Sequence, residues 1–314
     1  MTASARVGEF EQLRPHLMSV AYRLTGTVAD AEDIVQDAWL RWETHRATAI
    51  DDLKAWLTTV VSRLALDRLR SAAHRRETYV GEWLPEPVVT GFDGADPLAS
   101  VVAGEDARFA AMVVLENLSP DQRVAFVLHD GFAVPFPEIA QVLGASAESA
   151  RQLASRARRA VSAAPPPAAD HAEVVGKLLE AMASGDLDRV VGLLHPDVTF
   201  TGDSNRRAPT VARVVHGSDK VARLLLGLRR RYGAQRLLGS GLLGLVNGEL
   251  GLYSPGAEAT DDAPAIAPRI QAMTVRDGQV VAIYDIANPD KFTGSPLNPA
   301  GPSAPTAPGR NPRS

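Results

Sequence analysis

Cysteine is absent from this chain, and its absence limits the chemistry that the protein can perform. None of the 314 residues is a cysteine, which excludes disulfides, thiolate catalysis and cysteine-ligated zinc. Positive charge is not in excess either, because the formal net charge is −4 and the pI is about 6.0. A protein that coats phosphates indiscriminately is usually basic overall, so any DNA contact is expected to be local and assisted by a partner.

Long apolar runs are also missing. The longest, such as Leu242 to Val246, are far too short to span a bilayer, and the N-terminus lacks the apolar core of a signal peptide. We therefore expect no membrane association and a cytoplasmic protein, which the lack of cysteine also fits. The length leaves room for two or three domains with cores of their own.

Composition divides the chain into successive segments. Two segments are helical by periodicity, two are linkers rich in proline, one changes from helices to strands, and the last is rich in Pro, Gly, Ser and Ala. In chain order they are the helical domain 8–77, the linker 78–105, the helical domain 106–162, the Pro/Ala linker 163–169, an α+β domain 170–292 and a disordered tail 293–314. Helices followed by strands predict an antiparallel sheet in the α+β domain.

Residues 135–161 are typical of a helix-turn-helix with a basic second helix. Pro137 suits the start of the first helix, Gly144 ends it, and Ser146 can cap the second. Alanines and a leucine form one stripe of that second helix. Its polar face carries Ser149, Arg151, Gln152 and Arg156. Such a face can lie in a DNA major groove, although an ordinary αα-hairpin fits the same pattern.

Two helices upstream have opposite charge. The helix over 28–42 has an apolar stripe and groups its acidic residues on another face, which is usually only a solvated surface. The basic stretch 52–77 is predicted to present arginines on its outer face together with Thr58, Thr59 and Ser62. Arginines suit phosphates, and short polar groups suit the bases of an unpaired strand.

Taken in order, these segments resemble an extracytoplasmic-function (group IV) sigma factor of bacterial RNA polymerase. The resemblance lies in DAEDIVQDAWLRW, in the tryptophan-led basic helix and in SPDQRVAFVLHDGFAVPFPEIAQVLGASAESARQLASRARRAV, and it covers about half of the chain. It implies sigma region 2 in 8–77 and region 4 in 106–162, both all-α, with no region 3 between them. Such a factor recruits core RNA polymerase to promoter DNA and performs no chemistry of its own.

The resemblance also implies roles for individual residues. The β′ coiled coil of polymerase would contact Asp30, Glu32, Asp33, Gln36, Asp37 and Trp39. The −10 element would contact Arg63, Arg68, Arg70, Arg75 and Arg76. The −35 element would contact Ser149, Arg151, Gln152 and Arg156, and the polymerase β flap is a further implied partner.

Two more motifs resemble signatures of a subgroup with a fused C-terminal domain of the SnoaL/NTF2-like fold, a cone-shaped α+β barrel around a pocket. They are WLPEP at 83–87 and NPDKF at 288–292. The subgroup's Asp-Gly-Gly-Gly-Lys motif reads Asp203-Ser204-Asn205-Arg206-Arg207 here, which keeps the aspartate and a basic residue but not the glycines. The resemblance implies that this domain regulates the sigma regions in cis.

A physical form of that regulation is a clamp between the two motifs. Phe292 and Trp83 would be its apolar anchors, and Lys291 would lie near Glu86. The other contact residues would be Leu84, Pro85, Pro87, Asn288, Pro289 and Asp290. A stiff linker and a strand-ending turn would explain the same motifs without any contact.

The pocket of the C-terminal domain leaves alternatives open. Enzymes also use this fold, and the candidate pocket residues are His195, Asp203, Tyr253 and Asp285, with Asp197 nearby in sequence. No carboxylate–histidine pair follows from their spacing, so we expect no enzyme activity, no metal and no cofactor. A small-molecule ligand is the alternative occupant. A stand-alone helix-turn-helix repressor is the remaining alternative, and the acidic face of 28–42 argues against it.

Overall fold

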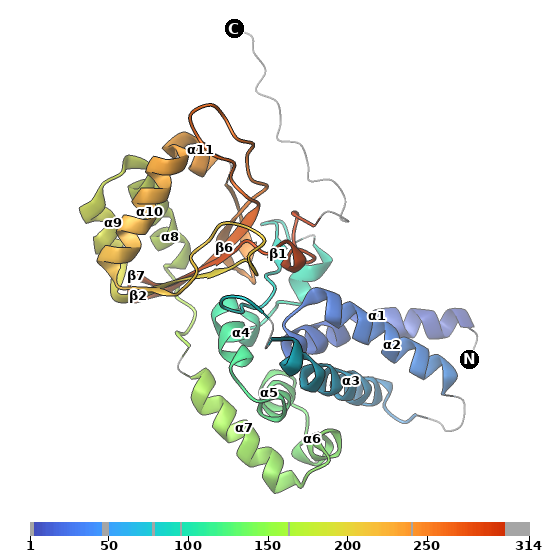
Figure 1. Cartoon of the computed structure of the whole chain (residues 1–314). Helices are drawn as coiled ribbons and strands as arrows, with labels where there is room; N and C mark the ends of the chain where they lie inside the picture. Colours follow the sequence, from blue (N-terminus) through green and yellow to red (C-terminus); the bar gives the residue numbers. More distant parts are fainter. Residues whose placement is uncertain are drawn as a thin grey trace.

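The chain folds into a helical half and an α+β half, and the linker 78–105 runs between them (Figure 1). The computed structural model describes residues 3–45, 50–76, 79–94, 96–162, 164–239 and 241–298. Of the predicted tail, 299–314 lie outside the described residues. Residues 293–298 are instead packed on the protein, because Gly294 bonds to the linker through both its N–H and its carbonyl oxygen.

The first three helices form one unit: α1 (Ala3–Thr25), α2 (Val28–Thr44) and α3 (Leu53–Arg76). Thr27 caps α2, because its side chain accepts a hydrogen bond from the Asp30 N–H at 3.2 Å. The α2 stripe that periodicity predicted is buried, namely Ala31, Ile34, Val35, Ala38 and Trp42, and Val28 is buried with it. This stripe turns the charged residues of α2 outward.

The second helical unit contains the predicted helix-turn-helix. It comprises α4 (Phe109–Glu116), α5 (Pro120–Phe126), a π-helical turn η3 (Val127–Gly131), α6 (Phe136–Leu143) and α7 (Ala147–Val161). Gly144 ends α6 in the left-handed conformation with a φ of 65°, and the Ser146 hydroxyl caps α7. Ala150, Ala154 and Ala157 of α7 are fully buried against the unit, which confirms the predicted alanine stripe.

These two helical units share one apolar core. Leu57 and Val61 of α3 belong to the same buried cluster as Val124 of α5 and Ile139 of α6. The sequence predicted two helical domains without fixing how they meet. Because apolar burial is the dominant favourable term in folding, the shared core holds the two units together in this conformation.

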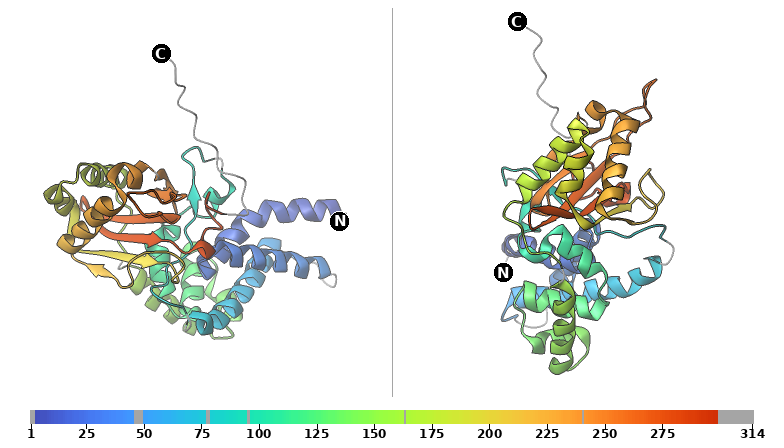
Figure 2. Two further views of the ribbon diagram at one scale, coloured as in Figure 1. Left: turned by 45° about the horizontal axis from the view of Figure 1, so that its top comes forward. Right: turned by 90° about the vertical axis from the view of Figure 1, so that its left-hand side faces the viewer.

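The C-terminal half confirms the predicted α+β class. Helices α8 (His171–Ser184), α9 (Leu187–Leu193), α10 (Ser218–Tyr232) and α11 (Ala234–Gly239) accompany a seven-stranded sheet. The strands are β1 (Val89–Thr90), β2 (Leu194–Asp203), β3 (Val215–His216), β4 (Leu242–Val246), β5 (Glu249–Ser254), β6 (Arg269–Arg276) and β7 (Gln279–Ile286), in the order β1-β4-β5-β6-β7-β2-β3. Figure 2 shows the helices of this half gathered on one side of the sheet.

The sheet is mixed, whereas the sequence predicted an antiparallel one. Strands β2 and β7 pair in parallel, with Gly202 opposite Asp285. The long connection through α10, α11 and four strands allows β7 to return beside β2 in the same direction. Side chains alternate between the two faces of β6, and the two faces pack in different places. Ile270 and Ala272 pack in a cluster with linker residues, whereas Met273 packs in the core under α8 and α10.

The linker between the helical units is part of the folded body. Its residues 84–90 are buried, and β1 forms an edge strand that pairs antiparallel with β4. The 3-10 helix η1 (Pro97–Ser100) follows, and the 3-10 helix η2 (Glu105–Ala107) leads from the linker into the second helical unit. Composition predicted a linker here but not a strand of the C-terminal sheet.

One side chain, Asn247, connects the linker to both helical units. It occupies the Asn-Gly turn between β4 and β5 with a φ of 50° and is almost completely buried. Its amide nitrogen donates to the Tyr22 hydroxyl of α1 at 2.8 Å and to the Ala107 carbonyl oxygen at 2.7 Å. Its amide oxygen accepts from the Val88 N–H at 3.0 Å.

Replacing Asn247 with glycine tests this junction. Glycine keeps the positive φ, so the change removes only the side chain. It leaves the Val88 N–H and the Ala107 carbonyl oxygen unpaired, while the Tyr22 hydroxyl keeps its bond to the Glu86 carbonyl oxygen, and we expect a cost of about 2–4 kcal/mol. Urea unfolding followed by tryptophan fluorescence measures the loss. Asn205→Gly is the matched control, because Asn205 also has a positive φ but makes only an exposed contact to Val80. Equal losses in both variants would contradict the role of Asn247.

Candidate nucleic-acid interface and interdomain clamp

The acidic face of α2 is open to solvent. Glu32, Asp33, Gln36 and Asp37 are exposed, while Asp30 is half-buried. Trp39 is half-buried because its ring packs against Phe10, with centroids 5.0 Å apart. Leu40 is 50% exposed on the same helix and was missed by the sequence analysis. An apolar residue outside the buried stripe was the signal that could have identified it.

Arg68 of α3 joins the acidic face rather than standing apart from it. Its Nε donates to Asp30 Oδ1 at 2.7 Å, and its guanidinium reaches Asp33 Oδ2 at 3.4 Å. The acidic and basic helices are therefore ion-paired with each other in this conformation. Arg75 and Arg76 belong to α3, but their side chains lie outside the described residues.

The two other arginines expected at the −10 element contact the second helical unit. Arg63 donates to the Gln141 carbonyl oxygen of α6 at 3.2 Å, and Arg70 pairs with Asp121 of α5 at 3.0 Å. Both contacts are exposed, so each contributes only a small free energy and can be exchanged for phosphate. The face of α3 expected to contact DNA is thus partly covered by the helix-turn-helix unit.

Thr58 and Ser62 correct the prediction for the outer face of α3, because both are buried. The Ser62 hydroxyl donates to the Thr58 carbonyl oxygen at 2.6 Å, and the Thr58 hydroxyl lies 3.0 Å from His16 Nε2. A helical serine or threonine can bond to its own backbone, which removes the cost of burying the hydroxyl. Thr59 is half-buried.

The outer face of α7 is the most accessible of the expected DNA contacts. Arg151, Gln152 and Arg156 are exposed and Ser149 is half-buried. Glu148 holds two of them, Arg151 at 3.3 Å and Gln152 at 3.4 Å. Figure 1 shows α7 at the edge of the helical half, on the far side from the C-terminal helices.

Buried arginines join the two helical units, and periodicity could not reveal them. Arg123 of α5 is buried, donates from Nε to the Arg23 carbonyl oxygen at 3.0 Å and pairs with Glu116 at 2.8 Å. It thereby satisfies a carbonyl near the C-terminal end of α1. Arg23 in turn pairs with Asp106 at 3.0 Å, and its guanidinium lies over the Phe132 ring.

WLPEP and NPDKF meet at a buried ion pair. Lys291 Nζ lies 2.6 Å from Asp203 Oδ2, also donates to the Leu84 carbonyl oxygen, and sits 3.5 Å from the Trp83 ring centroid. Asp203 additionally accepts from the Leu84 N–H at 2.8 Å and from the Tyr79 hydroxyl. We call these residues, Tyr79, Trp83, Leu84, Asp203 and Lys291, the clamp.

Lys291 lies near Glu86 as predicted, since its charge opposes the rise that burial causes in the pKa of Glu86. It forms an ion pair with Asp203, which therefore belongs to the clamp and not to the pocket. Glu86 accepts from the Val28 N–H at 2.8 Å and from the Gly294 N–H at 2.9 Å. Burial raises the pKa of Glu86, and these backbone donors oppose that shift.

The remaining motif residues surround the clamp. Phe292 is buried in a cluster with Leu84, Val89 and Phe109, so it anchors the C-terminal segment as expected. Pro85 and Pro87 are buried in the linker. The Asn288 amide donates to the Tyr79 hydroxyl at 3.0 Å, Pro289 begins the 3-10 helix η4 (Pro289–Lys291), and Asp290 makes an exposed pair with Arg207 at 3.3 Å.

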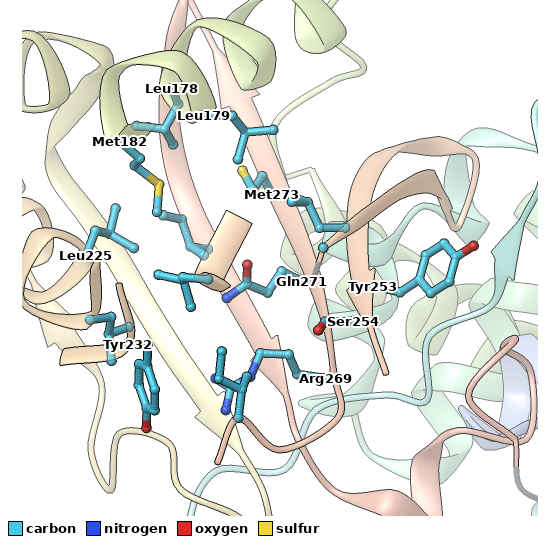
Figure 3. Close-up of a pocket in the computed structure, with 16 residues that line it drawn as sticks. Leu178, Leu179, Met182, Leu225, Tyr232, Tyr253, Ser254, Arg269, Gln271 and Met273 are labelled. Atoms are coloured by element: carbon cyan, nitrogen blue, oxygen red, sulfur yellow. The ribbon is translucent and has the colours of Figure 1, made fainter. Parts of the chain in front are cut away.

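The candidate pocket residues do not converge. Tyr253 lines a pocket beneath α8 and α10 (Figure 3), whereas Asp285 is not part of its lining and accepts a hydrogen bond from Gln271, which does line it. His195 lies at the start of β2 near Arg276, and the Asp197 carboxylate is 95% exposed. Among the residues that the structure describes, no group of three metal-ligating side chains occurs, and no helix is long and apolar enough to cross a membrane.

The two helical units with these surfaces define a sigma factor of the sigma-70 class. The family model for Sigma-70 region 2 matches residues 10–75, and that for Sigma-70 region 4 matches 108–161. The chain belongs to the ECF RNA polymerase sigma factors. It is 69% identical to the sigma factor SigJ of Mycobacterium tuberculosis over 98% of this chain and 99% of that protein.

Two further comparisons agree with this family assignment. The crystal structure of M. tuberculosis SigJ superimposes with a TM-score of 0.84 at 68% identity, covering 93% of this chain and all of that one. The M. tuberculosis sigma factor SigI is 36% identical over 68% of this chain and 73% of its own length. The likeness to SigJ includes the C-terminal half, whereas the family models cover only the helical units.

The clamp ion pair can be tested by a double-mutant cycle. Lys291→Met leaves the Asp203 carboxylate buried without its cation, which we expect to cost about 3–5 kcal/mol of unfolding free energy. Combining it with Asp203→Asn removes the unpaired charge, so the double variant should lose at least about 1 kcal/mol less than the sum of the single losses. Arg207→Met at the exposed pair is the control and should cost about 0–1 kcal/mol. Additive losses at the clamp would contradict this account.

Acidification should loosen the contact between the helical units. The His16 ring packs edge-on against Phe132 of the second helical unit, with centroids 5.3 Å apart. Burial lowers the pKa of His16 to about 4, and Lys54 and Arg23 act in the same direction. Because the folded pKa lies below the ordinary value of 6.5, neutral His16 contributes to the stability of the folded contact. This contribution to stability is complete above pH 6.5 and is lost as the pH falls toward 4. After discounting for partial exposure, we expect a loss of at most about 2 kcal/mol.

Small-angle scattering at pH 7.5 and pH 5 measures this opening as an increase in the radius of gyration. His16→Gln keeps a hydrogen-bonding side chain that does not titrate, so its radius should change less over the same interval. An equal change in both proteins would show that His16 is not responsible.

Proposed function

We propose that the chain recruits core RNA polymerase to promoters with −10 and −35 elements and starts transcription there, and that its C-terminal domain regulates this activity in cis. Membership in the ECF family supports the first part. The observation that carries the second part is the buried clamp, because it ties the linker between the two sigma regions to the C-terminal domain.

Polymerase binding is assigned to the exposed face of α2. Glu32, Asp33, Gln36 and Asp37 present negative charge there, and Leu40 supplies an apolar contact beside them. A charged rim with an apolar centre suits a complementary basic surface, which gives fast association and a defined register. The β′ coiled coil is the expected partner, and the β flap would meet region 4.

Contact with the −35 element is assigned to α7. Arg151 pairs with Glu148 in an exposed contact and lies over the Phe136 ring, so little free energy is lost when its guanidinium turns to DNA. Arg151, Gln152 and Arg156 lie on one face beyond the Ser146 cap. Residues in the first turns of a recognition helix are those that reach base edges in the major groove.

Contact with the −10 element requires the helical units to separate. Arg63 and Arg70 of α3 are engaged by region 4 in the present conformation. These exposed contacts are weak, so polymerase and promoter can replace them, while Arg123 and the shared core oppose opening. The clamp fixes one end of the linker and thereby limits how far the two regions can move apart.

In vitro transcription with purified core polymerase tests both parts. The template is a promoter selected from a random library by the full-length protein. Asp37→Lys should weaken core binding by about tenfold, since it reverses one charge at the interface, whereas Asp188→Lys on exposed α9 should not. Arg156→Ala should lower open-complex formation, with Arg230→Ala of α10 as its control.

Truncation before Asn288 tests regulation in cis. Removing NPDKF deletes Lys291 and Phe292 but retains both sigma regions, so the transcript yield should change while core binding is retained. An unchanged yield after this truncation and after deletion of the whole C-terminal domain would overturn the regulatory part. Promoter binding without polymerase would instead favour a stand-alone repressor.

A further inference from the structure

The pocket of the C-terminal domain is apolar around nearly its whole wall. It has a volume of about 60 Å³ and lies between α8, α10 and the inner faces of β5 and β6 (Figure 3). Leucine and methionine dominate its lining, including Leu178, Leu179, Met182, Leu225 and Met273. Methionine side chains adapt their shape at low cost, so the volume can increase around an occupant.

Two polar side chains from β6 interrupt this wall. Arg269 and Gln271 both line the pocket, and Gln271 is the register partner of Asp285 on β7. Asp285 is only 1% exposed and accepts hydrogen bonds from Gln271 Nε2 at 3.1 Å, Arg269 Nη1 at 3.1 Å and the Thr210 hydroxyl at 2.6 Å. The carboxylate is therefore engaged by all three side chains.

These hydrogen bonds determine which polar atom the pocket presents to a ligand. A carboxylate can only accept, so Gln271 must turn its amide nitrogen toward Asp285 and its Oε1 away from it. Among the described residues no group donates to that oxygen, and it is not buried in protein atoms. Figure 3 shows the Gln271 amide among the apolar side chains of the pocket.

The pocket also carries no free charge. Arg269 is neutralised by Asp285, and its other nitrogens donate to the carbonyl oxygens of Ala267 and Pro209. An anionic ligand would have to compete with a buried carboxylate for this guanidinium, and a cationic ligand would find no carboxylate facing it. The site favours a neutral molecule.

We propose that this pocket binds a small neutral alcohol or phenol, with its apolar body against Met182 and Leu225 and its hydroxyl donating to Gln271 Oε1. The apolar wall supplies the affinity through burial, and Gln271 Oε1 supplies the selectivity. A molecule without a donor leaves that oxygen unpaired in an apolar pocket and binds more weakly for that reason.

Ligand binding can affect the clamp through the paired strands β2 and β7. This extension rests on the function proposed above. Asp285 lies opposite Gly202, the residue before Asp203, and the Ala287 N–H donates to the Asp203 carbonyl oxygen at 2.7 Å. Strand β7 then continues into NPDKF. An occupant that fixes Gln271 against Asp285 stiffens the two strands that position Asp203 and Lys291.

Ligand-observed NMR titration of the full-length protein tests binding directly. Phenol and toluene are matched probes, because they have nearly the same size and only phenol can donate. The wild-type protein should bind phenol about tenfold more tightly than toluene, and Gln271→Leu should lose that preference. Met182→Trp fills the pocket and should abolish binding of both probes, and circular dichroism checks that each variant folds.

Three results would overturn the ligand site: no saturable binding of phenol to the wild-type protein, equal affinity for phenol and toluene, or a preference that survives in Gln271→Leu. Hydrogen exchange tests the extension separately. Saturating phenol should slow exchange of the Leu84 and Ala287 amides, which bond to Asp203. Unchanged exchange with the pocket occupied would overturn the coupling, and it would leave the sigma activity and the ligand site unaffected.

Discussion

The buried ion pair between Lys291 and Asp203 is the contact on which the arrangement of the two halves depends. Both groups are almost completely desolvated, and such a pair is tolerated only when every remaining donor and acceptor is satisfied. Leu84, Tyr79 and the Trp83 ring provide those partners, and all of them belong to the linker between the sigma regions. A linker that composition predicts only as an ordered or semi-extended segment is thereby held against the C-terminal sheet.

Neighbouring contacts make this attachment cooperative. Asn247 binds the linker, α1 and the start of the region 4 unit through one side chain, and β1 extends the C-terminal sheet with linker residues. The sigma regions in turn share an apolar core and hold each other through Arg123. Moving one region therefore perturbs the others, so the C-terminal domain is mechanically coupled to both sigma regions.

Local features of the sequence predicted the helices well. Periodicity and capping residues located α2 and the helix-turn-helix, because both signals act within a few residues along the chain. Resemblance suggested that WLPEP and NPDKF meet. It did not reveal that Lys291 pairs with Asp203, 88 positions away, or that Asn247 reaches Tyr22 across 225 positions. The parallel pairing of β2 with β7 and the burial of Ser62 likewise depend on tertiary packing.

Single-molecule energy transfer between regions 2 and 4 tests the central claim most directly. The chain has no cysteine, so Arg41→Cys on α2 and Arg159→Cys on α7 place two dyes at defined exposed positions. The account predicts one narrow, high-transfer population for the clamped protein and a shift to lower transfer when Lys291 is replaced by methionine. Identical distributions with and without Lys291 would contradict the claim that the clamp sets the spacing of the two promoter-binding regions.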